Sequence, residues 1–240
     1  MPVSPVAIRV PGHAEVRLST TSGHVEVIGE ERPDVVIESG APSDQQIESD
    51  ATGRVALTSA RGGSATLQVR CPSGSDLVVG TVSGHVTLRG QLGNARVTTI
   101  SGNIEVERAD ALDVRTISGS IQVERCAGVC NLRTKSGRTT IGSAGDTEVS
   151  TISGRITLDE ATAGVKMRSV SGTVELGTQG HGDVAVQTMS GSVRVAVAHG
   201  VRPSARLRSL SGRPRCDCPE GDDCRINVNT LSGRIEVVPD

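Results

Sequence analysis

A serine recurs down the chain in the phrase Thr-(Ile/Val/Leu/Met)-Ser-Gly-x-(Ile/Val), with a clean copy at 99–104. A serine hydroxyl becomes a nucleophile only with a general base in hydrogen-bond reach. No His or Lys recurs beside these serines, and His24 and His85, which follow equivalent Ser-Gly pairs, are expected to be distant in register. Serine is also a favoured turn residue. We therefore interpret the phrase as a turn and predict no catalytic residues and no enzyme activity.

Cysteine is the next residue type that could do chemistry, and the six are Cys71, Cys126, Cys130, Cys216, Cys218 and Cys224. The last three fall within nine residues, but one C-x-C with a distant Cys does not match the paired C-x-x-C of structural zinc sites. Cys130 and Cys216 align with columns of apolar residues, where a buried Cys acts as a small hydrophobe. Metal binding by Cys216, Cys218 and Cys224 and a disulfide among them stay open as weak alternatives, the disulfide disfavoured in a reducing cytosol.

No other cofactor or metal is indicated, because the calcium-binding G-G-x-G-x-D nonapeptide does not occur. We expect the cysteine segment to be a loop with incidental thiols.

Arginine is concentrated at 201–215, a segment without acidic residues that precedes the acidic stretch 217–223. The segment is either a docking patch for an acidic partner or a solvated face. Pro214 stands where other copies place Ile or Val, so we predict a protruding loop at 213–225. Loops often carry binding function. The candidate partner-contact residues, in this loop and in the arginine segment that leads into it, are therefore Arg206, Arg208, Arg213 and Arg215.

Composition excludes several function classes. The 240 residues carry a net charge of −2 with a pI near 6.2, so no global field favours nucleic acid or an acidic membrane surface. Phe, Tyr and Trp are absent, which removes the platforms that stack bases and argues against a polysaccharide-acting enzyme. We expect no nucleic-acid partner. No apolar run could cross a bilayer and no secretory signal pattern is present, so we predict a cytoplasmic protein without a transmembrane segment.

The elements that carry these residues follow from the repeat itself. Ser-Gly occurs at 22–23 and then, at steps of 17 to 21 residues, at 83–84, 101–102, 118–119, 136–137, 153–154, 171–172, 190–191, 211–212 and 232–233. A fixed short period indicates a repeat architecture, whose units stack on their neighbours. We predict one domain over 1–240, with regular repeats at 81–240 and irregular coils with longer loops at 1–80.

Each repeat has apolar residues six and four positions before the serine and three and five after it, as Val149, Ile156 and Leu158 illustrate around Ser153. Such period-two alternation indicates two short strands with one apolar face. Gly supplies a positive φ at the corner between them. The sequence therefore predicts an all-β fold, a single-stranded parallel β-helix (β-solenoid), right-handed by default, with about 17–21 residues per repeat. Strand parity leaves open whether the Thr column faces in or out.

The phrase T-x-S-G-x-(I/V)-x-(V/L), with its approach at 69–79, resembles the bacterial adhesin-type β-strand repeat family, domain-of-unknown-function family 4097. The resemblance covers nearly the whole chain, most strongly residues 65–240. It implies a β-helix-like fold, no established enzymatic activity and envelope- or stress-associated roles. The family often places Asp after Ser-Gly, whereas this chain has Arg138, Arg155, Arg213 and Arg234 among others, so a cation-attracting corner is not expected.

Two functions remain. The first is a structural or interaction module that presents a flat side or a loop to a protein partner of unknown identity. The second is a self-associating scaffold that forms filaments, because the ends of a solenoid are open strand edges. Residues 234–238 run as a bare strand almost to the last residue, which makes them the expected open edge.

Overall fold

The computed structural model describes residues 6–10, 12–39, 45–50, 53–59 and 66–240, and these residues form strands and turns without a helix. The prediction of an all-β protein is confirmed. Two compact units are present, Met1–Gln122 and Val123–Asp240, and each is described by itself. Unit 2 takes its first strand residues from β9 (Ile121–Cys126) and continues with β10 (Cys130–Arg133), β11 (Ser136–Ala144), β12 (Thr147–Ala161), β13 (Val165–Thr178), β14 (Val184–Val197), β15 (Pro203–Ser209), β16 (Arg215–Cys216), β17 (Cys224–Ser232) and β18 (Ile235–Pro239).

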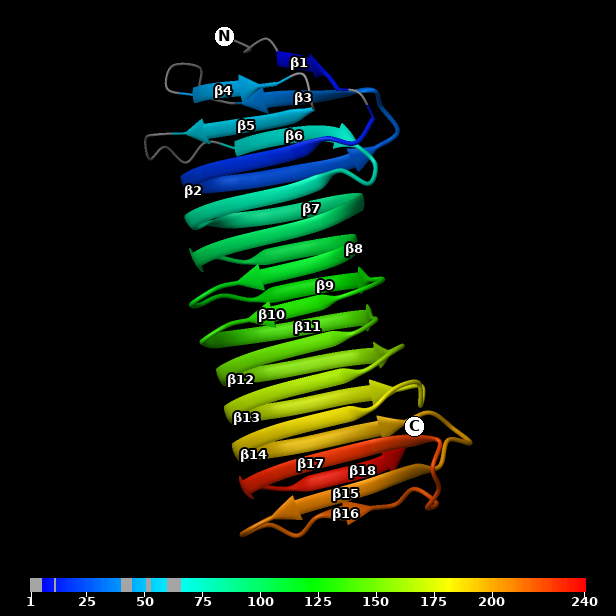
Figure 1. Ribbon diagram of the computed structural model, residues 1–240. Coiled ribbons are helices and arrows are strands. Elements are labelled where there is room, and N and C mark those ends of the chain that lie inside the picture. The colour runs from blue at the N-terminus through cyan, green and yellow to red at the C-terminus, as the bar shows by residue number, and fades with distance from the viewer. Residues whose placement is uncertain (1–5, 11, 40–44, 51–52, 60–65) are drawn as a thin grey trace. The chain divides into compact units, whose positions relative to one another are not determined.

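Successive copies of the phrase in unit 2 pair in parallel and in register (Figure 1). Ser136 pairs with Ser153 and Ser153 with Ser171, so like residues stack on like residues. The apolar columns point inward, and Val149 and Met167 are both fully buried. The core of the unit is thus the set of aliphatic columns that the alternation predicted, stacked at about 4.8 Å per step.

The last coil of unit 2 lies out of chain order. β14 pairs with β17 and β18, the final copy in the sequence, and these strands pair on their other side with β15 and β16. Figure 1 shows β15 and β16 beyond β17 and β18. The prediction that residues 234–238 form the open edge was therefore wrong, because β18 lies between two strands and the outer edge belongs to β15 and β16.

This order also corrects the placement of Cys216. Its column partner Val237 is fully buried, but Cys216 itself is exposed, as is Ala205 at the start of the same coil. No further coil of the described chain covers them. The segment 213–225, predicted as a loop, contains β16 and the first two residues of β17, so its residues outside strands are 213–214 and 217–223.

Unit 1 contains β1 (Val6–Arg9), β2 (Glu15–Glu30), β3 (Asp34–Ser39), β4 (Gln45–Ser49), β5 (Arg54–Ser59), β6 (Thr66–Pro72), β7 (Asp76–Ser101) and β8 (Ile104–Arg115). β2 pairs in parallel with β7 on one side and with β5 and β6 on the other. The repeat did not indicate three further pairings, β1 with β3, β3 with β6 and β4 with β5, which are antiparallel. The first copy of the phrase is therefore covered by strands that come later in the chain, whereas the last copy, in unit 2, is covered by strands that come before it.

Candidate interaction surface

The Ser-Gly corner has a fixed internal geometry that decides which side chains face outward. At the corner of β12, Thr151 is buried and its Oγ1 donates a hydrogen bond to the carbonyl oxygen of Ser153 at 3.2 Å. The same bond forms from Thr134, Thr188 and Thr230. The Thr column thus faces in, which the sequence left open. Because successive side chains of a strand alternate, the residue between Thr and Ser must face out.

Glycine is required at the corner for two reasons. Gly154 has φ +139°, in agreement with the predicted positive φ, and Gly102 has φ +146°. In addition, a Cβ on Gly154 would collide with the carbonyl oxygen of Gly137 in the neighbouring coil. The coils therefore approach each other closely at this edge, where their backbones stack without side chains between them.

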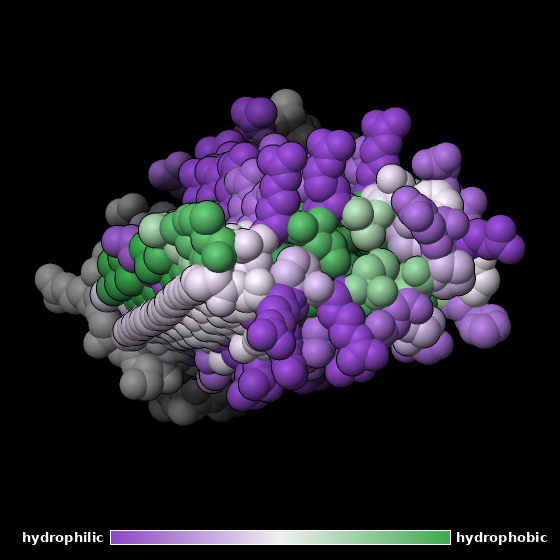
Figure 2. Space-filling model, turned by 90° about the horizontal axis from the view of Figure 1, so that it is seen from below, coloured by the Kyte–Doolittle hydropathy of each residue, from purple (hydrophilic) through white to green (hydrophobic). Residues whose placement is uncertain are grey.

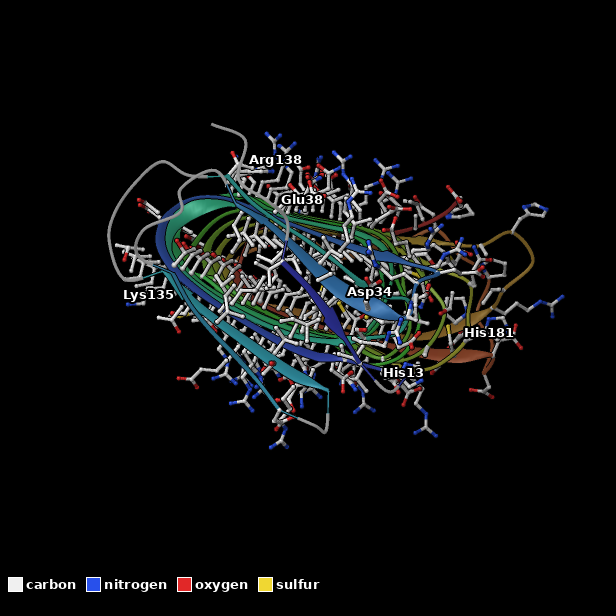
Figure 3. The ribbon with its side chains drawn as sticks, turned by 90° about the horizontal axis from the view of Figure 1, so that it is seen from above. His13, Asp34, Glu38, Lys135, Arg138 and His181 are labelled. Atoms are coloured by element: carbon white, nitrogen blue, oxygen red, sulfur yellow. The ribbon has the colours of Figure 1, made fainter. Side chains whose placement is uncertain are left out.

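The outward residues of unit 2 form a row that we call the apolar ridge, and its members in stacking order are Ile152, Val170, Met189, Leu231 and Leu210. Their exposed fractions run from 43% for Val170 to 81% for Leu210. Seen from the β15–β16 end in Figure 2, apolar side chains line one edge beside a pale row. Lys135 holds the equivalent position one coil earlier and projects from the narrow end of its coil (Figure 3). Sequence reasoning noted these residue types but not their exposure.

Unit 1 has its own outward apolar residues at the same position of the phrase. Val82, Ile100 and Ile117 are 44–49% exposed. Its first copy carries Thr21 there instead. The exposed apolar position is thus a property of the corner in both units, while the ridge of five consecutive coils belongs to unit 2.

Two columns of exposed side chains flank the apolar ridge, and they are rich in arginine. The first column is the position three residues before the Ser-Gly serine, and its arginines, which alternate with Ser or amide residues, are Arg133, Arg168 and Arg208. The second column is the position two residues after that serine. Its arginines are Arg138, Arg155, Arg234 and Arg213, with Thr173 and Ser192 between. Neither column contains an acid in residues 123–240. Among the described residues, ion pairs form from Arg168 to Glu148 at 3.6 Å and from Arg234 to Glu236 at 3.4 Å.

The predicted partner-contact arginines are all exposed and lie on the outer coil of unit 2. Arg208 and Arg213 belong to the two columns that flank the ridge. Arg215 forms an ion pair with Asp217 at 2.7 Å, and Arg206 lies two residues before Arg208 on β15. The structure thus brings half of this set to the ridge, and contact with a partner stays a prediction.

The cysteines of the candidate metal segment differ in exposure: Cys216 is exposed, Cys218 half-buried and Cys224 buried. All are free thiols. The described part of the chain gathers no three His, Cys, Asp or Glu side chains in an arrangement that could hold a metal ion.

The other three cysteines are buried in their coils. Cys130 is fully buried, as its apolar column predicted, and its contact with the Cys126 thiol together with burial raises the pKa of Cys130. Burial raises the pKa of Cys71 to about 11. The thiols of Cys71 and Cys130 therefore stay protonated at neutral pH, which makes them poor nucleophiles.

The two corner histidines of unit 1 are stacked. Their ring centroids lie 5.1 Å apart because β2 pairs directly with β7 and sets His24 against His85. The expectation that they are distant in register was wrong. The strands between them in sequence that pair with β2, namely β5 and β6, lie on its other side, so β7 is its direct neighbour. Nε2 of His85 lies 3.4 Å from Glu105.

No helix among the described residues is long and apolar enough to cross a membrane. A search of curated proteins finds no match. Three solved structures, each described as a "putative adhesin", are similar to the chain. The one from Parabacteroides distasonis is 13% identical over 99% of this chain and 96% of its own, with a TM-score of 0.48. That from Bacteroides fragilis is 12% identical over 97% and 96%, with a TM-score of 0.41. The third, from Parabacteroides merdae, is 9% identical over 98% and 95%, with a TM-score of 0.44.

The family comparison is more specific, and it agrees with the resemblance carried by the repeated phrase. The family model described as Toastrack DUF4097 matches residues 45–238, which includes every regular copy of the Ser-Gly corner. The chain therefore belongs to the Toastrack DUF4097 family.

Proposed function

We propose that the chain is a non-enzymatic, adhesin-type interaction module whose coils hold a row of side chains at fixed spacing for a partner. The observation that carries this proposal is the apolar ridge, in which five consecutive coils each expose one aliphatic or thioether side chain. Contiguous apolar patches on a protein surface mark sites of interaction. The same position could be polar without disturbing the core, as Lys135 and Thr21 demonstrate.

The proposal includes a regular scaffold. In it, each unit winds as a single-stranded, right-handed β-helix, the hand that parallel connections adopt almost always. Support comes from the in-register parallel pairing of successive copies. A stacked scaffold of this kind suits binding, because it fixes the spacing of outward side chains at one step per coil.

The cellular place of the module is part of the proposal. We place the chain in the cytoplasm, where its six cysteine thiols would stay reduced. An envelope- or stress-associated role, which the family resemblance implies, would then be exercised from the cytoplasmic side. Cell fractionation with an antibody against the chain tests this, and recovery outside the cytoplasmic and inner-membrane fractions would contradict it.

A self-assembling scaffold is the second candidate, favoured by the uncovered outer coil of unit 2. Ala205 is exposed there and Leu207 is half-buried, although both stand on core columns. The same strand carries devices that hinder edge pairing: Pro203 lacks an N–H, and Arg206 and Arg208 add charge. These features rank the filament below the binding module.

Photo-crosslinking in cells tests the binding module. A photoreactive residue is placed at Met189 on the ridge or, as a control, at exposed Gln179 in the loop before β14. The proposal predicts adducts, whether with protein or with lipid, from position 189 and few from position 179. Equal labelling from both positions, or none from the ridge, would contradict it.

A further inference from the structure

We propose, as a step that rests on the binding module above, that the apolar ridge of unit 2 docks onto the surface of an anionic lipid bilayer. In this arrangement the five ridge side chains enter the headgroup region, and the arginine columns beside them contact lipid phosphates. The sequence alone gave the opposite expectation, because a net charge of −2 predicts no attraction to an acidic surface. The distribution of the charge changes that conclusion.

The shape of the ridge fits a bilayer. Its five side chains stand at the same corner of consecutive coils, so they form a straight row roughly 20 Å long at about 4.8 Å per step. Each is 43–81% exposed in the free chain. The row occupies the narrow edge of the coil where Lys135 projects, away from the loop that carries His181 (Figure 3). A narrow apolar edge of this kind can enter between lipid headgroups without displacing the rest of the fold, as the apolar face of an interfacial helix does.

The charge around the ridge fits an anionic surface. The ridge position and its two flanking columns hold seven arginines and Lys135 in unit 2, and these three columns contain no acid. The nearest acids, Glu148, Glu175 and Glu236, stand one column further out, and Glu148 and Glu236 each pair with a flanking arginine. Arg138 and Arg155 are adjacent in register, are exposed, and form no ion pair with a described residue. Long cationic side chains beside an apolar row can reach phosphates while their stems stay on the apolar surface.

The same charges argue against a second copy as the occupant. Two ridges packed face to face would bring arginine columns opposite arginine columns, and like charges across an interface are repulsive. Nucleic acid would satisfy the arginines. Its bases, however, would find no aromatic side chain to stack on, because the chain has none and the ridge is aliphatic. An anionic bilayer provides both an apolar layer and phosphates at the required depth.

Vesicle sedimentation of the full chain tests the apolar part. Wild-type protein is mixed with phosphatidylcholine vesicles, alone or with phosphatidylglycerol added. We expect binding to the phosphatidylglycerol vesicles and at least about tenfold weaker partitioning when Ile152, Val170 and Met189 are all changed to Ser. The matched control is Val129→Ser, which removes a side chain of 50% exposure seven residues before its corner serine, immediately before the start of β10.

The charge part is tested with a second pair of variants. Arg138→Gln with Arg155→Gln should lower partitioning by roughly 25-fold at low salt, since each cation near an anionic surface contributes about fivefold. Arg125→Gln with Arg225→Gln removes two exposed arginines away from the ridge and should leave binding within about twofold. Raising the salt concentration should reduce the difference between the two double variants.

Several outcomes would overturn the proposal. These are no vesicle binding by the wild type, equal binding to neutral vesicles, or unchanged binding by the Ser variant. A ridge-dependent dimer in analytical ultracentrifugation would also overturn it in favour of a second copy. If vesicles fail while position 189 still crosslinks to a protein in cells, the lipid partner is wrong and the binding module stands. If position 189 crosslinks to nothing, the module itself is wrong.

Discussion

The backbones of neighbouring coils meet at Gly154, and replacing it with Ala tests the corner directly. A non-glycine residue at φ +139° costs about 1–3 kcal/mol in backbone strain. The new Cβ also meets the carbonyl oxygen of Gly137, a backbone atom that cannot rotate away. Overpacking of this kind costs a further ~1–3 kcal/mol, so the free energy of unfolding should fall by about 4 kcal/mol in total.

Gly200→Ala is the matched control, because Gly200 has φ +88° and no atom within 4 Å of the position its Cβ would take. Only the strain remains there, about 1–2 kcal/mol. With ~2–4 °C per kcal/mol for a chain of this size, Tm should fall by roughly 8–16 °C for Gly154→Ala and by about 2–8 °C for Gly200→Ala. Thermal unfolding followed by far-UV circular dichroism measures both. Equal shifts would refute the stacked-backbone corner.

Three further predictions concern the corner, the thiols and the outer coil. Thr151→Val should lower the free energy of unfolding by about 1 kcal/mol, because it removes the hydroxyl that donates a hydrogen bond to the corner carbonyl. Thr151→Ser keeps a hydroxyl and should retain most of the wild-type stability. Chemical denaturation measures both, and two variants equal to wild type would count against the bond. Under native conditions at pH 8 an alkylating reagent should modify exposed Cys216 and spare Cys71. Burial raises the pKa of Cys71 to about 11, so its thiolate appears only as pH rises well above neutral. Peptide mass spectrometry measures the modification, and protection of Cys216 would contradict the order of the last coils. Changing Arg206 and Arg208 to Thr should promote self-association through the outer strand; sedimentation velocity that shows a monomer at all concentrations would argue against edge protection.

The regular part of the fold could be predicted because its signal is repeated. Each copy of the phrase carries the same apolar alternation, so the core columns and the parallel pairing followed from aligning the serines. Gly at the corner was predicted for its φ, and the structure adds a second reason in the backbone contact between Gly154 and Gly137.

The order of the last coils could not be predicted from the phrase, because Ser211 and Ser232 match it equally well as neighbours of Ser190. The difference lies in the core columns. The copy around Ser232 places Ile226, Val228, Ile235 and Val237 there, whereas the copy around Ser211 places Ala205, Leu207, Pro214 and Cys216. An outermost coil buries less, so the poorer columns were the available signal.

The apolar ridge was missed for a different reason. Its residues were part of the phrase from the beginning, but their exposure depends on whether the preceding Thr faces in. That orientation is fixed by a hydrogen bond within the corner, from Thr151 Oγ1 to the Ser153 carbonyl, and strand parity around a corner does not reveal it. The basic columns were visible only in part, as Arg138, Arg155, Arg213 and Arg234, because the other column lies on the far side of the corner.

The most direct test of the ridge uses the absence of tryptophan from the chain. Met189→Trp places a single fluorophore on the ridge, and Val129→Trp places one immediately before the start of β10 as a control. On addition of phosphatidylglycerol-containing vesicles, we predict a blue shift in the emission of the Met189→Trp variant, because the indole moves from water into the headgroup region. The Val129→Trp variant should show no shift. An unshifted spectrum for Met189→Trp, or the same shift for both variants, would contradict the proposal that this edge of the molecule meets the membrane.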